Sequence, residues 1–451
     1  MGDKNDLADK LIIIEESLNE LHFKGVPIGH LLSKFNENIY RGIPIPGRWG
    51  LILSLIKFLF TGRKIKKPEV RNNETLVLLS KISNKPQCNA LIDPLKKELK
   101  DKALLYSPLI AENEIEPYVF IKRNTSLIRK EVKTFIEKHK DEILTIYSDR
   151  GINVDSTLLS FSLWTQLIAL TNWIAFFDCF TFNKIIVDFD RDYINAPLVL
   201  AAKHHKIQTV TLVHGVINPP YGYYPIIADE IWMWGDHQKK QMIESGLEEN
   251  KIRIVGNPIV RKLEKNRENY LSKSTIGIAL GNVGKTINDS LLRHVLNLKA
   301  LQYDFQWIIK LHPSMKKEGY LCSYESEKVE LKSFVEISNE SLFNQIDFLI
   351  LGNSGLGYEA LINDIPLLVY LANENSKEND HIMIKYGNCP QINNPHELDL
   401  VLTRIATESD YKSKLMRQET PFLTSIFYKT GRDSTNEILK QLNLQNRFES
   451  I

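Results

Sequence analysis

Residues 347–361 have the sequence DFLILGNSGLGYEAL. The first five residues form an apolar run of strand length, and the last four have the pattern of a helix. The glycines between them let the backbone turn tightly, and the N–H groups of such a turn, followed by a helix N-terminus, attract an anion. This stretch therefore predicts a buried strand, a phosphate-binding turn and a helix in succession.

The same alternation of strand and helix runs through two regions of the chain. Strands that are apolar on both faces and separated by helices predict parallel sheets covered on both sides. In the first region we expect strands over 75–80, 103–106, 184–188, 208–213 and 230–234, and helices over 126–139, 158–177 and 196–205. In the second region we expect strands over 275–280, 306–311, 335–337, 347–351 and 366–370, and helices over 288–301, 341–345, 358–363 and 398–407.

A polar stretch, 261–274, lies between the two regions and is typical of a surface linker. The length of 451 residues is about three times that of one typical domain. We therefore predict an α/β protein with two doubly wound domains facing a cleft, one over 74–260 and one over 270–430. Residues 1–73 stand outside this scheme and are expected to form an N-terminal helical extension.

The composition excludes several classes of protein. The chain has 57 Lys and Arg against 55 Asp and Glu, a net charge of +2, which gives no reason to expect nucleic acid as a partner. The four cysteines are far apart, so they encode neither a disulfide framework nor a zinc finger, and a reducing compartment is expected. The charged opening MGDKNDLADK is unlike a signal peptide, which predicts a cytoplasmic protein.

Two apolar stretches, 51–60 and 161–182, are not expected to cross a membrane. The first is about half the ~20 residues that a span requires, and the second carries Gln166, Asn172 and Asp178. The first stretch nevertheless combines an apolar face with basic residues, which predicts a peripheral contact with an anionic leaflet. The residues expected to make that contact are Trp49, Lys57, Arg63, Lys64, Lys66 and Lys67. The alternative is a helix packed on the first domain with solvated basic residues beyond it.

Ligands of doubly wound folds bind at the carboxyl ends of the strands, and the second domain carries three unusual strand ends. After the strand 347–351, the Ser354 hydroxyl adds a donor to the glycine turn, and Glu359 can accept both hydroxyls of a ribose. The alternatives are a simple connecting turn and an acid favoured by the helix dipole. The residues expected to bind here are Asn353, Ser354, Gly355, Gly357 and Glu359.

The other two strand ends of that domain contribute a histidine and a glycine turn. Lys310 and Leu311 lead to His312 and Pro313, and the proline holds His312 extended at the edge of the sheet, where it can donate to a phosphate oxygen. The alternative is that His312 has a structural role, in packing or in capping. Residues 281–286 (GNVGKT) resemble the end of a P-loop, but Ala279 stands where that motif requires its first glycine. We therefore expect only that Gly281 and Asn282 line the cleft.

In the first domain, His214 and Gly215 end one strand, and an acidic run, 188–192, ends another. A carboxylate of this run, Asp188, Asp190 or Asp192, could orient or deprotonate an acceptor hydroxyl, as could His214. The alternatives are a buried His214 and an Asp192 that caps the following helix. The Asp188-Phe189-Asp190 sequence also matches a two-carboxylate pattern that holds a metal-bound nucleotide in single-domain transferases, which the repeated alternation disfavours.

Taken together, five stretches resemble GT-B glycosyltransferases of bacterial capsule and surface-polysaccharide biosynthesis. They are His214-Gly215, Trp234-Gly235 before a helix ending at Gly246, residues 254–258 (IVGNP), Leu311-His312-Pro313, and the Asn353-Ser354-Gly355 turn leading to Glu359. The resemblance covers roughly residues 184–435. Residues 430–435 are similar to the segment that carries the chain of this fold back across the cleft, so 431–451 are expected to form a C-terminal helix on the N-terminal domain.

The resemblance implies two Rossmann-like domains with separate tasks. The second would bind a nucleotide sugar, with His312 and Ser354 at the phosphates, Glu359 at the ribose and Asn282 near the transferred sugar. The first would bind a glycan or lipid-linked acceptor, with His214 or an acid of 188–192 as the general base. The helix N-terminus and His312 would stabilise the leaving phosphate, so neither a metal ion nor a cofactor is expected.

The resemblance leaves the donor open between CMP-linked and UDP-linked sugars. A His-Pro pair with a Ser-containing turn is similar to transferases that use CMP-sugars, but Ser354-Gly355 stands where that pattern usually has two hydroxyl residues. Three other functions also stay open: a nucleotide-sugar 2-epimerase, a CDP-polyol phosphotransferase of the teichoic-acid type, and a non-catalytic partner in polysaccharide assembly.

Overall fold

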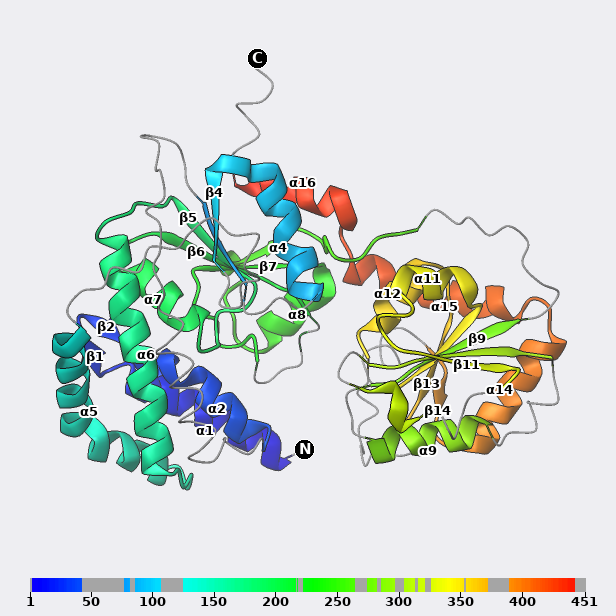
Figure 1. The fold of residues 1–451 in the computed structure, drawn as a ribbon, viewed down its shortest axis with the longest axis horizontal. Coiled ribbons are helices and arrows are strands. Elements are labelled where there is room, and N and C mark those ends of the chain that lie inside the picture. Colours follow the sequence, from blue (N-terminus) through cyan, green and yellow to red (C-terminus); the bar gives the residue numbers. More distant parts are fainter. Residues whose placement is uncertain are drawn as a thin grey trace, which may run out of the picture. The chain divides into compact units, whose positions relative to one another are not determined.

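A computed structural model describes residues 2–42, 77–81, 86–106, 125–215, 217, 222–263, 274–281, 285–296, 304–312, 315–320, 326–352, 354–371 and 389–442. The chain folds into two compact units (Figure 1). The first unit comprises Met1–Ile259 and Ser434–Ile451, and the second comprises Val260–Asp433. The residues that predict membrane contact, Trp49 to Lys67, lie outside the described part of the chain, so that prediction stays a prediction.

The first unit contains a sheet of six strands, all parallel. In spatial order the strands are β4 (Ala103–Tyr106), β3 (Val77–Ser80), β5 (Lys184–Val187), β6 (Gln208–Leu212), β7 (Glu230–Met233) and β8 (Ile252–Ile254). Leu78 pairs with Ile185 and both belong to the core on one face, whereas the next pair, Leu79 and Ile186, belongs to the core on the other face. This alternation explains why consecutive positions in the middle of these strands are apolar.

Helices cover both faces of this sheet (Figure 1). One face packs on α4 (Pro86–Leu99) and on the C-terminal helix α16 (Gly431–Gln441), whose Ile438 is fully buried. The other face packs on α1 (Gly2–Leu18), α5 (Thr125–Ser148), α6 (Ser156–Phe177) and α7 (Asn195–His204). The unit also contains α2 (Ser33–Tyr40), α8 (Asp236–Glu244), the antiparallel strands β1 (His22–Phe23) and β2 (Val26–Pro27), and the 3-10 helices η1 (Gly29–Leu32), η2 (Lys100–Lys102) and η3 (Glu249–Lys251).

The helix α6 is the described helix that is long and apolar enough to cross a membrane, with a mean hydropathy of 1.3 over its most apolar window. Half of that window is buried inside the structure, where α6 packs against α5 and α7. Asp155 begins the helix by accepting hydrogen bonds from the N–H groups of Thr157 and Leu158, at 2.8 and 3.0 Å. Within the helix, the Gln166 side chain donates to the carbonyl of Tyr193 at 3.1 Å, so this polar residue is used inside the unit.

A fully buried ion pair joins the N-terminal helices to the sheet. Arg191, just after β5, donates from its two terminal nitrogens to the two oxygens of Glu15 on α1, at 2.9 and 3.1 Å. Ser33 and Asn36 on α2 also donate to Glu15, at 3.1 and 3.2 Å. A third bond from Arg191 reaches the carbonyl of Pro225, at 2.7 Å. The N-terminal helices are therefore part of the first unit's core, fixed to the loop that follows β5.

The second unit contains another sheet of six parallel strands. In spatial order these are β11 (Val329–Lys332), β10 (Gln306–Lys310), β9 (Thr275–Ala279), β12 (Phe348–Leu351), β13 (Leu367–Tyr370) and β14 (Gln391–Ile392). Gly277 in the middle of β9 has a packing reason, because a Cβ atom there would lie 2.8 Å from the Cδ1 atom of Ile346. The two sheets confirm the predicted fold class.

Among the described residues, the helices of the second unit are α9 (Lys285–Leu296), α11 (Asn339–Gln345), α12 (Leu356–Ile362), α14 (Pro395–Thr407) and α15 (Tyr411–Ile426), with the 3-10 helix η5 (Lys317–Gly319). Local sequence sets where some of them begin. Asn394 accepts a hydrogen bond from the N–H of Glu397 at 2.9 Å, and Pro395 occupies the first turn of α14.

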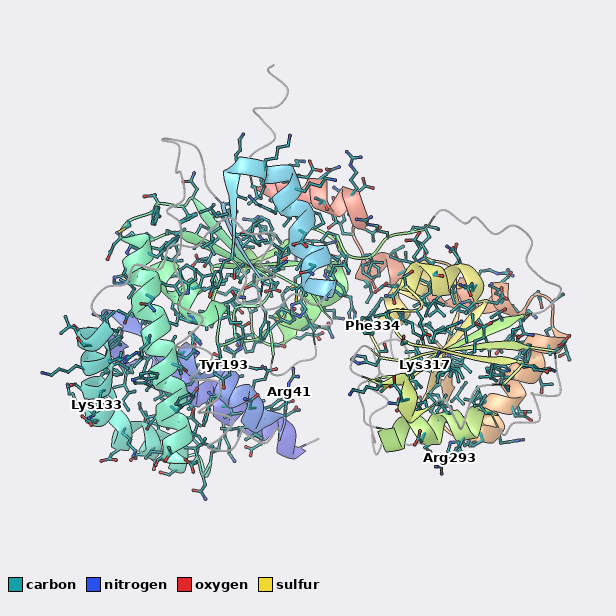
Figure 2. All side chains as sticks on the ribbon, in the orientation of Figure 1. Arg41, Lys133, Tyr193, Arg293, Lys317 and Phe334 are labelled. Atoms are coloured by element: carbon teal, nitrogen blue, oxygen red, sulfur yellow. The ribbon has the colours of Figure 1, made fainter. Side chains whose placement is uncertain are left out.

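One predicted strand is wrong. Residues 335–337 form part of a turn, and the strand of this region is β11, at 329–332. The reason is Glu336, whose carboxylate accepts hydrogen bonds from the N–H and the hydroxyl of Ser333, both at 2.7 Å, and from Lys317 at 2.9 Å. These bonds close the turn and leave Val335 75% exposed. Phe334 is also exposed, and Figure 2 shows it at the same end of the unit as Lys317.

The buried pair makes the stability of the first unit sensitive to Arg191. We expect Arg191→Met to lower the free energy of unfolding of this unit by about 3–5 kcal/mol, because it removes the buried cation that donates to both oxygens of the Glu15 carboxylate. The double variant Glu15→Gln/Arg191→Met should recover part of the loss, since the glutamine is neutral and still accepts from Ser33. Urea unfolding measures both, with the exposed Arg150→Met as control; equal stability of Arg191→Met and that control would contradict the expectation.

Candidate functional site

The order of strands in each sheet defines where a ligand can bind. In the first sheet the order reverses between β3 and β5, and in the second between β9 and β12. In doubly wound folds the crevice at such a point, outside the carboxyl ends of the strands, receives the ligand. Asp188 follows β5, Gly281 comes two residues after β9, and the turn at Ser354 follows β12. The structure therefore brings sequence-predicted residues to the reversal point of each sheet.

In the first unit, the ring of His214 is held by a backbone carbonyl. Its Nδ1 atom lies 2.7 Å from the carbonyl oxygen of Asp188. That oxygen can only accept, so the bond requires the proton on Nδ1 and leaves the lone pair on Nε2. No described residue forms a hydrogen bond with Nε2, and the side chain is only half-buried. The ring is thus oriented to present Nε2 as an acceptor.

Tyr223 completes the surroundings of His214 and was not predicted from the sequence. Its hydroxyl accepts the backbone N–H of His214 at 3.1 Å and lies 2.9 Å from Nδ1. Burial raises the pKa of Tyr223 well above its usual range, and the nearby carboxyls of Asp188 and Asp190 act in the same direction. The hydroxyl therefore stays protonated, and the Tyr223 ring packs edge-on against the Phe189 ring.

The side chain of Asp188 is fully buried. Its Oδ1 atom accepts from the Nδ2 atom of Asn195 at 3.3 Å, and Asn195 also donates to the carbonyl of Phe189 at 2.8 Å. Asn195, the first residue of α7, is itself fully buried. This residue, which the sequence analysis missed, holds the β5 loop so that the Asp188 carbonyl meets His214.

The other two acids of the run also bind backbone N–H groups. Asp190 is fully buried, and its Oδ2 atom accepts from Ile227 at 2.7 Å and Ala228 at 2.9 Å. Asp192 accepts from the N–H groups at the start of α7, those of Ile194 and Asn195, at 2.7 and 2.6 Å, which is the capping role left open by the sequence. Burial raises the pKa of Asp192 to about 8, against the effect of these bonds. Of these candidate bases, all of them described in the structure, the three aspartates are buried and His214 is half-buried.

In the second unit, Ser354 begins the turn that leads into α12. Its hydroxyl oxygen accepts from the N–H of Leu356 at 3.3 Å, and its carbonyl accepts from the N–H of Gly357, also at 3.3 Å. Ser354 is half-buried and Gly355 is exposed, so a ligand can reach both. Three residues predicted to bind nearby, Asn282, Pro313 and Asn353, lie outside the described residues.

Glu359 lies on α12 beside two residues from other elements. Asn339, the first residue of α11, donates from Nδ2 to Glu359 Oε2 at 3.0 Å. Lys310, the last residue of β10, donates to Oδ1 of the same Asn339 at 2.7 Å and to the carbonyl of Ile337 at 2.8 Å. Burial lowers the pKa of Lys310 to about 8, although Glu359 acts in the opposite direction. Burial also raises the pKa of Glu359, which Asn339 and Lys310 oppose.

Residues that follow two further strands, β9 and β10, lie at the same edge of the second sheet. The buried Asn288 on α9 donates to the carbonyl of Gly281 at 3.0 Å and so fixes the turn after β9. His312 is half-buried two residues after β10, and its carbonyl accepts from the N–H of Met315 at 2.8 Å. Gly281, Lys310, His312, Ser354 and Glu359 therefore all lie at the carboxyl edge of one parallel sheet.

The residues missed by sequence reasoning share one property: their hydrogen-bond partners lie on other helices, strands or loops. Tyr223 contacts a residue nine positions earlier, and Asn339 contacts Lys310 and Glu359 from the far side of a turn. The available signal was an Asn directly after Ser338, which is a helix-capping serine that accepts from the N–H of Ser341 at 2.9 Å. Within the described residues, no group of three or more His, Cys, Asp and Glu side chains is placed to hold a metal ion.

Comparison with known proteins shows the fold. No protein-family model matches the chain, and no curated protein matches it. The UDP-GlcNAc 2-epimerase from Neisseria meningitidis bound to UDP-GlcNAc is similar in structure at 15% identity, with a TM-score of 0.51 over 83% of this chain and 100% of that one. Another UDP-N-acetylglucosamine 2-epimerase is 14% identical, with a TM-score of 0.50 over 84% and 98%. The glycotransferase of kitacinnamycin is 10% identical, with a TM-score of 0.50 over 82% and 99%.

These structures share a GT-B-like fold, and the chain has it too. The match extends over nearly the whole length of each relative, so both units take part in it. The fold is common to epimerases and glycosyltransferases, and it does not by itself decide the reaction.

The raised pKa of Asp192 predicts a pH-dependent effect of removing its charge. A carboxyl that is protonated in the folded state contributes stability that is present below its ordinary pKa of 3.8 and is lost as pH rises toward 8. Asp192→Asn keeps an oxygen for the two N–H groups but has no proton to lose. Relative to wild type, the variant should therefore gain up to about 1.4 kcal/mol per pH unit between pH 5 and pH 8, by urea unfolding. A difference in stability between wild type and Asp192→Asn that does not change with pH would contradict the raised pKa of Asp192.

Proposed function

We propose that the protein is a glycosyltransferase that moves a sugar from a nucleotide-sugar donor to a surface-polysaccharide or lipid-linked glycan acceptor. The observation that carries the proposal is the placement of Glu359, with one carboxylate oxygen unoccupied by any described residue, beside the exposed Ser354 turn at the reversal point of the second sheet. This is where a doubly wound fold binds a nucleotide. The GT-B-like fold, which in the Neisseria epimerase holds UDP-GlcNAc, supports a nucleotide-sugar substrate.

The second unit binds the donor in this proposal. The Oε1 atom of Glu359 accepts the ribose hydroxyls, while His312 and the Ser354 turn bind the phosphates. Gly281 and Asn282 contact the transferred sugar. The donor is CMP- or UDP-linked, and the UDP-GlcNAc of the Neisseria structure favours UDP.

The first unit activates the acceptor. The Nε2 atom of His214 takes the proton from an acceptor hydroxyl as its oxygen bonds to the anomeric carbon of the sugar. The bond from that carbon to the nucleotide phosphate breaks, and the negative charge passes to the phosphate oxygens. Donors at His312 and the Ser354 turn stabilise this charge. The tautomer imposed by the Asp188 carbonyl supports the assignment of His214 over the buried acids.

A nucleotide-sugar 2-epimerase is the second candidate, because two structures of this fold, at TM-scores of 0.50 and 0.51, are UDP-GlcNAc 2-epimerases. The two reactions differ in their need for an acceptor. Interconversion of two epimeric sugars by the protein and UDP-GlcNAc alone would favour the epimerase. Sugar transfer that requires an added glycan would favour the transferase.

The nucleotide site predicts selective stabilisation by one nucleotide. In a thermal-shift screen of CMP, CDP, UDP and GDP, we expect one of them to raise the unfolding temperature, because it binds the folded state alone. Glu359→Ala should weaken its binding about tenfold or more, since a hydrogen bond to a charged group is lost, and Ser354→Ala should weaken it less. Glu340→Ala, an exposed acid on α11, is the control. No shift with any of the four nucleotides would contradict the proposal.

Nucleotide binding should also depend on pH through Glu359. Its pKa is raised by burial, and only the ionised carboxylate accepts two hydroxyl hydrogens, so affinity should fall on acidification at a pH above the usual range of a glutamate. Calorimetric titration between pH 5 and pH 8 measures this. The nucleotide phosphate also titrates, so the fall attributed to Glu359 is the part absent from Glu359→Gln; identical profiles in the two proteins would contradict the assignment.

A further inference from the structure

We propose that Lys310 and Asn339 are positioning residues for the nucleotide, which hold one oxygen of Glu359 and thereby present the other oxygen to the ribose hydroxyls. The inference rests on the proposed function of the second unit as a nucleotide site. It assigns new roles to two residues: Asn339 enters the site for the first time, and Lys310 acts through Asn339 without touching the ligand.

The three side chains form a linear chain of hydrogen bonds. Lys310 Nζ donates to Asn339 Oδ1 at 2.7 Å, and Asn339 Nδ2 donates to Glu359 Oε2 at 3.0 Å. No direct ion pair joins Lys310 and Glu359, so the amide lies between the two charges. The Oε1 atom of Glu359 has no hydrogen-bond partner among the described residues, which leaves it available to a ligand.

The donor and acceptor roles in this series of hydrogen bonds follow from the chemistry of the lysine. A protonated amine has no acceptor, so the Asn339 amide must turn its oxygen toward Lys310 and its N–H₂ toward Glu359. A carboxylate accepts but does not donate, which agrees with the same orientation. Lys310 and Glu359 therefore both require the same orientation of the Asn339 amide, and the amide in turn orients the Glu359 carboxylate.

Backbone structure makes the arrangement rigid. Lys310 ends a central strand of the sheet, and its amine also donates to the carbonyl of Ile337, two residues before Asn339. The Ser338 hydroxyl begins α11 and so sets the position of Asn339. Each residue thus stands at the end of a strand or near the start of a helix, where its side chain has little freedom.

The electrostatic balance agrees with a positioning role. Burial favours the neutral form of both Lys310 and Glu359, lowering the pKa of the first and raising that of the second. The hydrogen bond from Asn339 and the charge of Lys310 act against this for Glu359 and favour its ionised form. Without the amide, the half-buried carboxylate would lose both its orientation and part of its charge.

The test compares ribose with deoxyribose nucleotides. Affinities for UDP and 2′-deoxy-UDP, and for CMP and 2′-deoxy-CMP, are measured by calorimetry for wild type, Glu359→Gln, Asn339→Asp and Lys310→Met. Asn339→Asp has the same shape but no donor for Glu359, and Lys310→Met breaks the chain at its other end. The matched control is Asn344→Asp, the same change at an exposed position of α11.

We expect wild type to prefer the ribose nucleotide and Asn339→Asp to lose about tenfold in that preference, with its affinity for the deoxy form unchanged. Lys310→Met should show the same selective loss.

An equal fall in affinity for the ribose and deoxyribose nucleotides would indicate a merely structural role and overturn the inference. If Glu359→Gln lost the preference for ribose while Asn339→Asp and Lys310→Met both kept it, the positioning role would be wrong and the proposed function would stand. A wild-type protein that bound neither UDP nor CMP would contradict the proposed function itself.

Discussion

The parallel pairing of strands is the constraint on which both units depend. When every strand of a sheet runs in the same direction, all carboxyl ends meet at one edge, and the crossover helices must cover both faces. The first sheet therefore brings Asp188 and His214 together from adjacent strands, and the second brings Gly281, Lys310 and Ser354 to one edge. Side chains that directly follow the strands are therefore brought close together by the sheet alone.

Each unit also contains a buried group of charges, and the two groups differ in one respect. In the first unit, Arg191 and the donors of α2 use both oxygens of Glu15 inside the protein, so the carboxylate serves to hold helices on a loop. In the second unit, Asn339 uses one oxygen of Glu359, and the other has no described partner. A buried carboxylate with all its acceptor positions filled stabilises a structure, whereas one with an open position can bind a ligand.

The sequence predicted the fold well because the apolar runs are short, continuous and separated by helical patterns. It failed at 335–337, where an apolar pair, Phe334 and Val335, stands in a turn closed by Glu336. It placed the candidate site by strand ends, a local rule, and so selected Lys310, His214 and Glu359 as candidates. It missed Tyr223, Asn195 and Asn339, because their roles depend on contacts between separate elements that no period or spacing records.

The acidic run 188–192 shows why residue type alone does not assign a base. Its three aspartates have the same chemistry in sequence, yet each is occupied by donors at the start of α7 or in the loop of Ile227 and Ala228. The group of this run that contacts His214 is the Asp188 carbonyl, an atom present in every residue and invisible to a search for motifs. That carbonyl sets the proton of His214 on Nδ1 and leaves Nε2 as the accessible acceptor. The acids therefore act on the candidate chemistry through the backbone they fix, and the imidazole is the group that can receive a proton.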